Sequence, residues 1–208
     1  MKKFNLICLG FFSISSLIAA TTQTIYLNFY EQVIIRQKDG ESYSRQYSEG
    51  IGKDTIPQYP LGTFIYRSVF KFDLSDIDNH AIINSVTVYT NCSGSGYTFR
   101  LTKISSLSPG DSEIWNDIGA GTVLCSGLDY GTNVTNSDAL KTAIQNALVS
   151  DELIVGALSE AETTIGSASD VYIQLEIEYT VPLLSLQAKN DLYGVNGGNI
   201  GVGVKDNF

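Results

Sequence analysis

The sequence has 208 residues, a formal net charge of −9 and a single His, and these values exclude several classes of protein. The negative charge argues against nucleic-acid binding, because phosphate recognition needs a basic surface. One His leaves little material for a His-based metal site or catalytic triad. With 43% hydrophobic and 17% charged residues, the composition is that of a folded domain and not of a disordered acidic tail.

The first twenty residues have the pattern of an export signal. Lys2 and Lys3 precede an apolar run, and Ala19 and Ala20 end it with small side chains. The run is short for a membrane span, although an uncleaved anchor is the alternative. We therefore predict a signal peptide over residues 1–20 and a secreted or cell-surface protein that does not span the membrane once the signal is removed. Loss of the two lysines makes the mature chain more acidic.

The rest of the chain reads mainly as β-strands. Residues 171–181 alternate strictly between apolar and polar side chains, which is typical of a strand with one buried face. Residues 64–74 alternate in a similar way. Residues 86–90 and 97–104 predict a hairpin, because they flank a stretch rich in Ser and Gly. Weaker strand patterns cover residues 24–30, 33–37, 153–158, 184–188 and 199–204.

One segment has a helical pattern instead. Apolar residues recur at helical spacing over 137–148, and Asn136 or Ser137 can cap the N-terminus. We expect this helix to lie across one end of a sheet. Many strands, Gly-rich turns and one short α-helix predict an all-β fold, an antiparallel β-sandwich that is jelly-roll-like. A Greek-key barrel is the alternative.

Pro182 follows the long strand and marks an expected boundary. We predict a β-sandwich domain over residues 21–182, followed by a Gly-rich β extension over 183–208. The extension resembles the start of a further unit, so the sequence is expected to belong to a longer modular protein. A disordered or strand-swapping tail is the alternative.

One block of residues resembles a known family. Arg67 and Ser68 lead a strand that ends in Phe-Asp-Leu-Ser at 72–75, and Ile83 to Tyr89 follow as a second strand. This arrangement is similar to the DNRLRE-type β-sandwich domains, over about residues 64–181. The resemblance implies a non-catalytic module of secreted, multi-domain proteins, some of which bind acidic polysaccharides. The acidity of this chain favours a neutral glycan or a protein partner, since like charges oppose association.

Exposed aromatic rings are the candidate ligand-binding residues, because sugars present apolar C–H faces that stack on them. Trp115 lies in a polar segment, Tyr130 lies between Asp129 and Gly131, and Tyr172 lies on the polar face of a strand. The alternative for Trp115 is that it closes one end of the sandwich beside the helix. Most other aromatic residues lie on apolar faces and are expected in the core.

Two further patterns leave alternatives open. Asp76, Asp78 and Asn79 form an oxygen-rich turn that is a weak candidate for Ca²⁺, and a solvated turn is the preferred interpretation because the full ligand set of an EF-hand-like loop is missing. Cys92 and Cys125 would close a loop of about 33 residues as a disulfide, which the chain-entropy model values at roughly 3–4 kcal/mol. The alternative is two reduced, half-buried thiols. Glu160, Glu162, Glu176 and Glu178 are interpreted as solubilising charge.

These patterns predict a secreted, non-catalytic module that binds carbohydrate or mediates adhesion at the cell surface. Its expected partners are a polysaccharide or cell-surface component and neighbouring domains, with no nucleic acid and no resident cofactor. A structural spacer without a glycan ligand is the second hypothesis. A small polysaccharide-active enzyme that uses Asp or Glu is the third hypothesis. It ranks last because the nearest carboxylate cluster, Asp73, Asp76 and Asp78, is explained by a turn, and because no Gly-x-Ser-x-Gly nucleophile motif is present.

Overall fold

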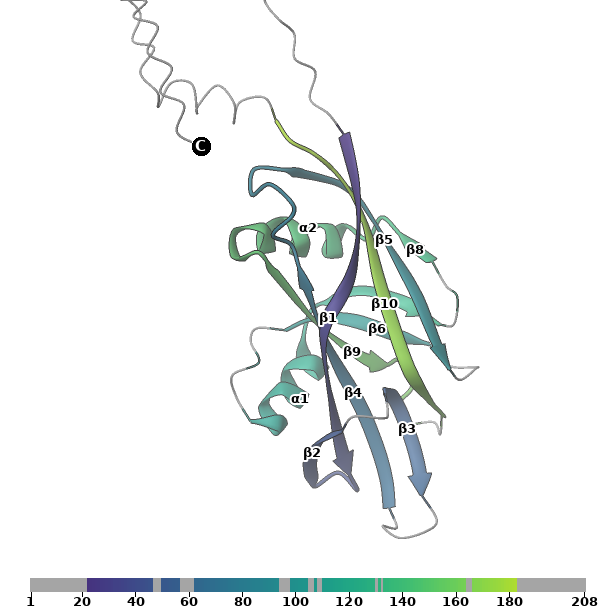
Figure 1. The fold of residues 1–208 in the computed structure, drawn as a ribbon. Coiled ribbons are helices and arrows are strands. Elements are labelled where there is room, and N and C mark those ends of the chain that lie inside the picture. Colours follow the sequence, from purple (N-terminus) through teal and green to yellow (C-terminus); the bar gives the residue numbers. More distant parts are fainter. Residues whose placement is uncertain are drawn as a thin grey trace, which may run out of the picture.

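The computed structural model describes residues 22–182, except 47–49, 57–61, 94–97, 105–106, 108–109, 130, 132 and 164–165. Within them the chain forms ten strands, all paired antiparallel, and two α-helices (Figure 1). The elements are β1 (Thr22–Lys38), β2 (Ser42–Gln46), β3 (Ile51–Ile56), β4 (Gly62–Asp73), β5 (Ile82–Ser93), β6 (Phe99–Lys103), α1 (Asp111–Ala120), β7 (Val123–Leu128), β8 (Asn133–Thr135), α2 (Asp138–Ala147), a 3₁₀ turn (Leu148–Ser150), β9 (Glu152–Ser159) and β10 (Gly166–Thr180). The predicted all-β antiparallel class is confirmed. Neither helix is long and apolar enough to span a bilayer.

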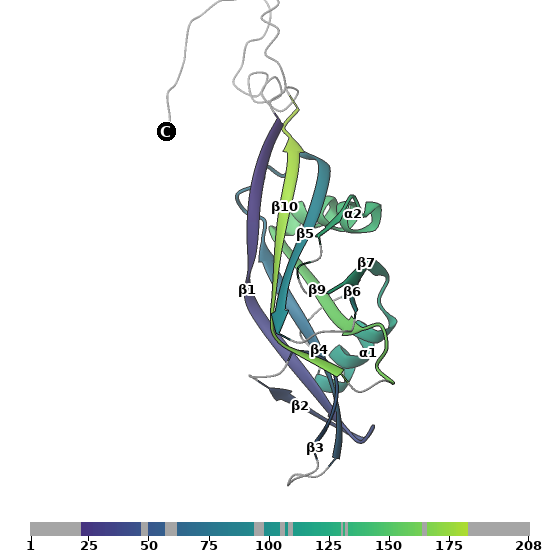
Figure 2. The same cartoon turned by 90° about the vertical axis from the view of Figure 1, so that its right-hand side faces the viewer.

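The strands form two layers, which share β1 and β10 (Figure 2). The first layer, sheet A, contains β8, β5, most of β10 and the first half of β1. The second layer, sheet B, contains β2, the second half of β1, β4, β9, β6 and β7, with β3 beside β4. β1 passes from sheet A to sheet B at a bulge between Phe29 and Glu31. Bulges of this kind bend a strand and let it change sheets.

The strongest sequence pattern is confirmed in β10. Val171, Ile173, Leu175, Ile177 and Tyr179 are buried, and the residues between them are exposed or half-buried. β4 also confirms the alternation expected over 64–74, with Phe64, Tyr66, Phe70 and Phe72 buried. The two weak patterns over 24–30 and 33–37 belong to one strand, β1.

The predicted hairpin between 86–90 and 97–104 is wrong. β5 pairs with β10 and β8 in sheet A, whereas β6 pairs with β7 and β9 in sheet B. The chain therefore crosses from one sheet to the other between these strands. A Ser- and Gly-rich connection between two apolar strands has the same composition in both arrangements, so the sequence did not distinguish them.

The predicted helix is confirmed as α2. Ser137 is its N-cap, and its side-chain oxygen accepts a hydrogen bond from the backbone N–H of Leu140. Leu140, Ala143 and Ile144 are buried. α2 packs against β5 of sheet A and against β7 and β9 of sheet B, so it bridges the two layers at one end of the sandwich. The other helix, α1, was not predicted.

The apolar residues form two main clusters. The larger cluster fills the space between the two sheets and includes Phe70, Phe72 and Ile173. The second lies on the opposite side of sheet B, where α1 covers the sheet with Ile114, Trp115 and Ile118. Gly156 on β9 permits this close approach, because a Cβ there would lie 2.9 Å from the Ile118 side chain.

Several predictions fall outside the described residues. They are the signal peptide over 1–20, the strands over 184–188 and 199–204, and the extension over 183–208. The boundaries of the β-sandwich domain, 21–182, likewise stay a prediction.

Candidate functional site

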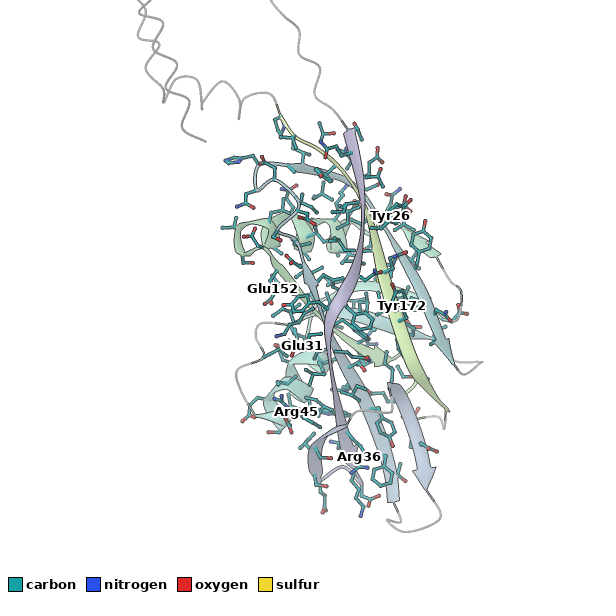
Figure 3. All side chains as sticks on the ribbon, viewed as in Figure 1. Tyr26, Glu31, Arg36, Arg45, Glu152 and Tyr172 are labelled. Carbon is teal, nitrogen blue, oxygen red and sulfur yellow. The ribbon has the colours of Figure 1, made fainter. Side chains whose placement is uncertain are left out.

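The outer face of sheet A carries an open group of aromatic and amide side chains. Alternation along β1, β10 and β5 turns these side chains away from the core, and the register of the strands brings them together. We call this group the tyrosine face, and it consists of Tyr26, Asn28, Tyr89, Tyr172, Gln174 and Glu176. Tyr26 is 57% exposed and Tyr172 is 40% exposed. Figure 3 shows both side chains over β10 on the same side of β1.

Glu176 lies at the centre of the tyrosine face. It stands opposite Tyr26 in the β1–β10 register, and its Oε1 accepts a hydrogen bond of 3.2 Å from the Tyr26 hydroxyl. Its Oε2 accepts a hydrogen bond from the hydroxyl of Tyr89 on the other neighbouring strand. The charge of Glu176 raises the pKa of Tyr26, and its hydrogen bond raises the pKa of Tyr89. Glu176 thus favours the protonated, hydrogen-bond-donating form of both phenols, and one carboxylate fixes rings from two strands.

Asn28 organises the other half of the tyrosine face. Its Oδ1 accepts hydrogen bonds from the Tyr172 hydroxyl and, at 2.8 Å, from Nε2 of Gln174. This arrangement leaves Nδ2 of Asn28 and Oε1 of Gln174 without a partner among the described residues. An amide donor and an amide acceptor side by side match a hydroxyl group, which both donates and accepts.

The charge of sheet A is entirely negative. Its strand segments, 22–28, 82–93, 133–135 and 169–180, contain Asp170, Glu176 and Glu178 but no Lys or Arg. An anionic ligand therefore meets no opposite charge on these strands and is repelled by Glu176 and Glu178. A neutral ligand is not subject to this electrostatic repulsion.

Of the two predicted aromatic ligand residues that the structure describes, Tyr172 lies on this face and Trp115 does not. Its ring centroid is 5.7 Å from that of Phe29, which in turn packs against Phe70. The exposed ring of Tyr172 is thus supported from below by the core. Tyr130 lies outside the described residues.

Trp115 was a candidate ligand residue in a polar loop, with burial as the alternative, and the loop interpretation is wrong. Trp115 lies on α1, is only 4% exposed, and packs between α1 and sheet B. Its ring contacts Tyr43 and lies 4.0 Å from the guanidinium carbon of Arg67. The burial considered as the alternative is correct, but the ring covers the outer face of sheet B and does not close an end beside α2. A ring without an exposed face does not stack on a sugar.

Glu162 is also not the solubilising charge that the sequence suggested. Arg67 donates from Nε and Nη2 to the two carboxylate oxygens of Glu162, at 2.7 and 2.8 Å, and from Nη1 to the carbonyl of Trp115 at 2.6 Å. Both side chains are mostly buried. The bidentate pair joins β4, α1 and the segment before β10, which gives the Arg-Ser block a structural role. Ser68 donates to the carbonyl of Gly50 at 2.6 Å.

Carboxylates also gather around Tyr30. Two of them, Glu31 and Glu152, lie on the other side of β1 from Tyr26 and Tyr172 (Figure 3). Tyr30 donates to Glu152, and this hydrogen bond, burial and the charges of Glu152, Glu31 and Asp73 raise its pKa to about 12. Glu31 pairs with Lys71 at 2.7 Å, and Asp73 accepts a hydrogen bond from the backbone N–H of Ser75. A phenol with this pKa is a poor general base near neutral pH, and each carboxylate already has a partner.

A shallow hollow of about 310 Å³ adjoins Glu152. It lies between the end of α2 and strands β6 and β9, and Lys103, Asn146, Ser150 and Glu152 supply its polar lining. The rest of the lining is aliphatic, and no aromatic ring faces it. The hollow therefore lacks the stacking surface that the tyrosine face offers.

The turn proposed for Ca²⁺ is held together by its own hydrogen bonds. Asp78 accepts from the backbone N–H of His80 at 2.8 Å, and Asp76 and Asn79 are exposed. Among the described residues no three His, Cys, Asp or Glu side chains gather as a metal site. The hydrogen bond from Ser75 lowers the pKa of Asp73, as expected for a carboxylate that caps a turn.

Cys92 and Cys125 are both free and both buried, so the disulfide considered as one alternative is not formed. They lie in the core cluster between the sheets. Burial raises the pKa of both thiols, to about 12 for Cys125. Such thiols are weak nucleophiles and poor metal ligands, because the reactive species is the thiolate.

Comparison with known proteins adds no family. No protein-family model matches the chain, and no curated protein matches it. The resemblance to DNRLRE-type domains therefore stays a prediction based on the Arg-Ser and Phe-Asp-Leu-Ser residues.

Sequence reasoning missed most of the tyrosine face. Tyr26 and Asn28 alternate with Ile25 and Leu27, so the period of two already indicated that both side chains face solvent. That they lie beside Gln174 and Glu176 depends on the register of strands about 150 residues apart. A single sequence contains no signal for this register.

Proposed function

We propose that this protein is a secreted, non-catalytic module that binds neutral carbohydrate on the tyrosine face. The observation that carries the proposal is a sheet face that no described helix or strand covers, on which exposed tyrosine rings lie beside amide groups. Rings supply flat apolar surface for the C–H faces of sugars, and the amides and Glu176 meet their hydroxyls. The expected export signal and the resemblance to DNRLRE-type domains support the same class of function.

The charges on sheet A favour a neutral ligand over an acidic one. Some domains of the resembling family bind acidic polysaccharides, but the strands of sheet A carry carboxylates and no cation. A neutral glycan fits the face better, because its binding requires no charge neutralisation. Adhesion to a cell surface is the role of such a module within a larger protein.

Affinity electrophoresis tests the proposal. Native gels would contain either a neutral polysaccharide (hydroxyethyl cellulose, xyloglucan, galactomannan or glycogen) or an acidic one (alginate or polygalacturonate). We expect retardation by at least one neutral polymer and none by the acidic polymers. Failure of every polymer to retard the protein would contradict glycan binding and favour the alternative, a structural spacer.

Variants locate the site within the same gels. Tyr26→Ala and Tyr172→Ala should each weaken retardation about tenfold or more, since each removes one stacking ring. Tyr30→Ala is the matched control, because Tyr30 is 55% exposed on the same strand but bonds to Glu152 away from the tyrosine face. Equal weakening by Tyr30→Ala would contradict the assignment of the site. Release of reducing sugar from any polymer would contradict the non-catalytic role.

A further inference from the structure

One edge of sheet A is open. Residues 22–28 of β1 pair with β10 on one side only, since β4 begins to pair at Phe29 and β2 at Ile34. Within the described residues, no strand pairs with the other side of 22–28. An open edge presents unpaired backbone N–H and C=O groups, which form a template for another strand.

Three other edge strands carry features that oppose such pairing. β8 has only three residues, and β2 has five and contains Arg45, which bonds to Asp111 of α1 at 2.9 Å. β7 pairs with β6 through two register irregularities. Short length, charge and irregularity are the usual means by which proteins protect edges.

The edge at 22–28 has none of these features. Its seven residues contain no charged residue, no Pro and no Gly, and their register with β10 is regular throughout. Ile25 is only half-buried at this edge, and Tyr26 is 57% exposed beside it. A second strand would cover both the backbone groups and part of this apolar surface.

The segment is complementary to itself. In the antiparallel register that pairs all of 22–28 with a second copy, Ile25 faces Ile25 and Thr24 faces Tyr26. The remaining pairs are Gln23 with Leu27 and Thr22 with Asn28. Residues that face outward in one copy then face outward in the other, as a continuous sheet requires. Thr opposite Tyr is a favourable cross-strand pair, and no like charges meet.

We propose that two copies of this chain associate through their β1 edges, with Ile25 on the two-fold axis. The joined sheet runs from β8 of one copy to β8 of the other. Tyr26 of the second copy then lies diagonally beside Tyr26 of the first, so the two tyrosine faces form one surface. The association does not depend on the proposed glycan binding, although it doubles the area that such a ligand meets.

The area buried by a seven-residue edge is small for a protein interface, so the dimer should be weak, with a Kd between about 1 μM and 1 mM. Sedimentation velocity of the unmodified protein should therefore show a monomer at low micromolar concentration and a growing dimer fraction toward millimolar concentration. A protein that stays monomeric over this range contradicts the proposal.

Cysteine cross-linking tests the register in the chain without the expected signal over residues 1–20, whose two native thiols, Cys92 and Cys125, are both buried. Ile25→Cys should form a covalent dimer under mild oxidation, because directly opposite residues have the Cα separation of a disulfide. Gln23→Cys is the matched control on the same edge, and it should stay monomeric because its own counterpart lies four residues away along the paired strand. Circular dichroism would establish that both variants are folded.

Equal cross-linking at the two positions contradicts the two-fold register. Absence of cross-linking at Ile25→Cys in the folded protein also contradicts it. Both outcomes are independent of the electrophoresis result, so failure of glycan binding and failure of dimerisation can be told apart.

Discussion

The two sheets share one core but differ on their outer faces. The outer face of sheet B is covered by α1, which places Trp115 over Arg67 and buries a second apolar cluster. The outer face of sheet A is open, with Tyr26 and Tyr172 held by hydrogen bonds to neighbouring polar side chains. An aromatic side chain that points outward from a sheet can therefore have either of two roles. It is structural where a helix covers the sheet, and it is accessible to a ligand where the face is exposed.

The two sheets also differ in their charged residues. Every Lys and Arg on the described strands belongs to sheet B, namely Arg36, Lys38, Arg45, Lys53, Arg67, Lys71, Arg100 and Lys103. On sheet B the cations that bond to carboxylates, such as Arg67 and Lys71, help to stabilise the fold. Sheet A has no cation on its strands, and two of its carboxylates accept hydrogen bonds from hydroxyl groups instead: Glu176 from Tyr26 and Tyr89, and Glu178 from Ser85.

The largest expected difference between the two faces is in the stability lost when an aromatic ring is removed from each. Trp115→Ala removes a ring that is 4% exposed and should lower the free energy of unfolding by about 3–5 kcal/mol. Tyr172→Ala removes a ring that solvent already reaches and should cost about 1 kcal/mol. Urea denaturation followed by circular dichroism measures both. Similar losses for the two variants would remove the distinction between a covered and an open face.

The carboxylates offer a second comparison. Glu162→Gln breaks a mostly buried bidentate pair and should cost about 3 kcal/mol, because Arg67 is left without its partner. Glu176→Gln changes a half-exposed carboxylate and should cost less than about 1 kcal/mol. A double-mutant cycle with Arg67→Met isolates the pair energy. A coupling near zero would show that the pair does not hold α1 against the sheet.

The close approach of α1 to sheet B predicts a smaller effect. Gly156→Ala places a Cβ 2.9 Å from the Ile118 side chain and should destabilise the protein by about 1–3 kcal/mol. Thr87→Ala on the open face of sheet A is the control, with an expected change within about 0.5 kcal/mol. Thermal unfolding of the two variants measures the difference, and an unchanged Tm for Gly156→Ala would contradict close packing of α1.

The smallest expected effect is a change in the alkaline titration of the tyrosines on the two sides of β1. Tyr30 has a pKa of about 12, and its protonated form is favoured by the fold. Its contribution to stability is therefore complete below the ordinary tyrosine pKa of about 10 and is lost as pH rises through about 12. Ultraviolet absorbance should show one phenol titrating earlier in Glu152→Gln, and two in Glu176→Gln, where Tyr26 and Tyr89 lose their partner. Unchanged curves would contradict these hydrogen bonds.

The sequence predicted the elements whose signal is local. β10, β4 and α2 each carry a strong period over a full element, so their buried faces could be listed in advance. β1 was divided in two because the bulge at Phe29–Glu31 reverses the alternation, with Leu27 facing the core before it and Ile34 after it. α1 has the same length as α2 but was missed because Gly110 and Gly121 bound it and its Asp, Ser, Asn and Gly residues are typical of a loop.

The candidate site was predictable only in part, for a related reason. Tyr172 could be placed on a solvent-facing strand face from the alternation of its own strand. Its companions Tyr26 and Tyr89 come from β1 and β5, and their position beside Glu176 is set by strand register. Trp115 was misplaced because the covering of sheet B by α1 is a tertiary contact that no local pattern encodes.

An NMR titration tests the central claim most directly. ¹⁵N-labelled protein would be titrated with oligosaccharide fragments of the neutral polymers used in the gels. Binding on the open face predicts that amide shifts change along residues 22–28 of β1, 172–178 of β10 and 85–91 of β5, and that α1 and β4 stay unchanged. Shifts centred on α1 and the outer face of sheet B, or no shifts with any fragment, would contradict the account.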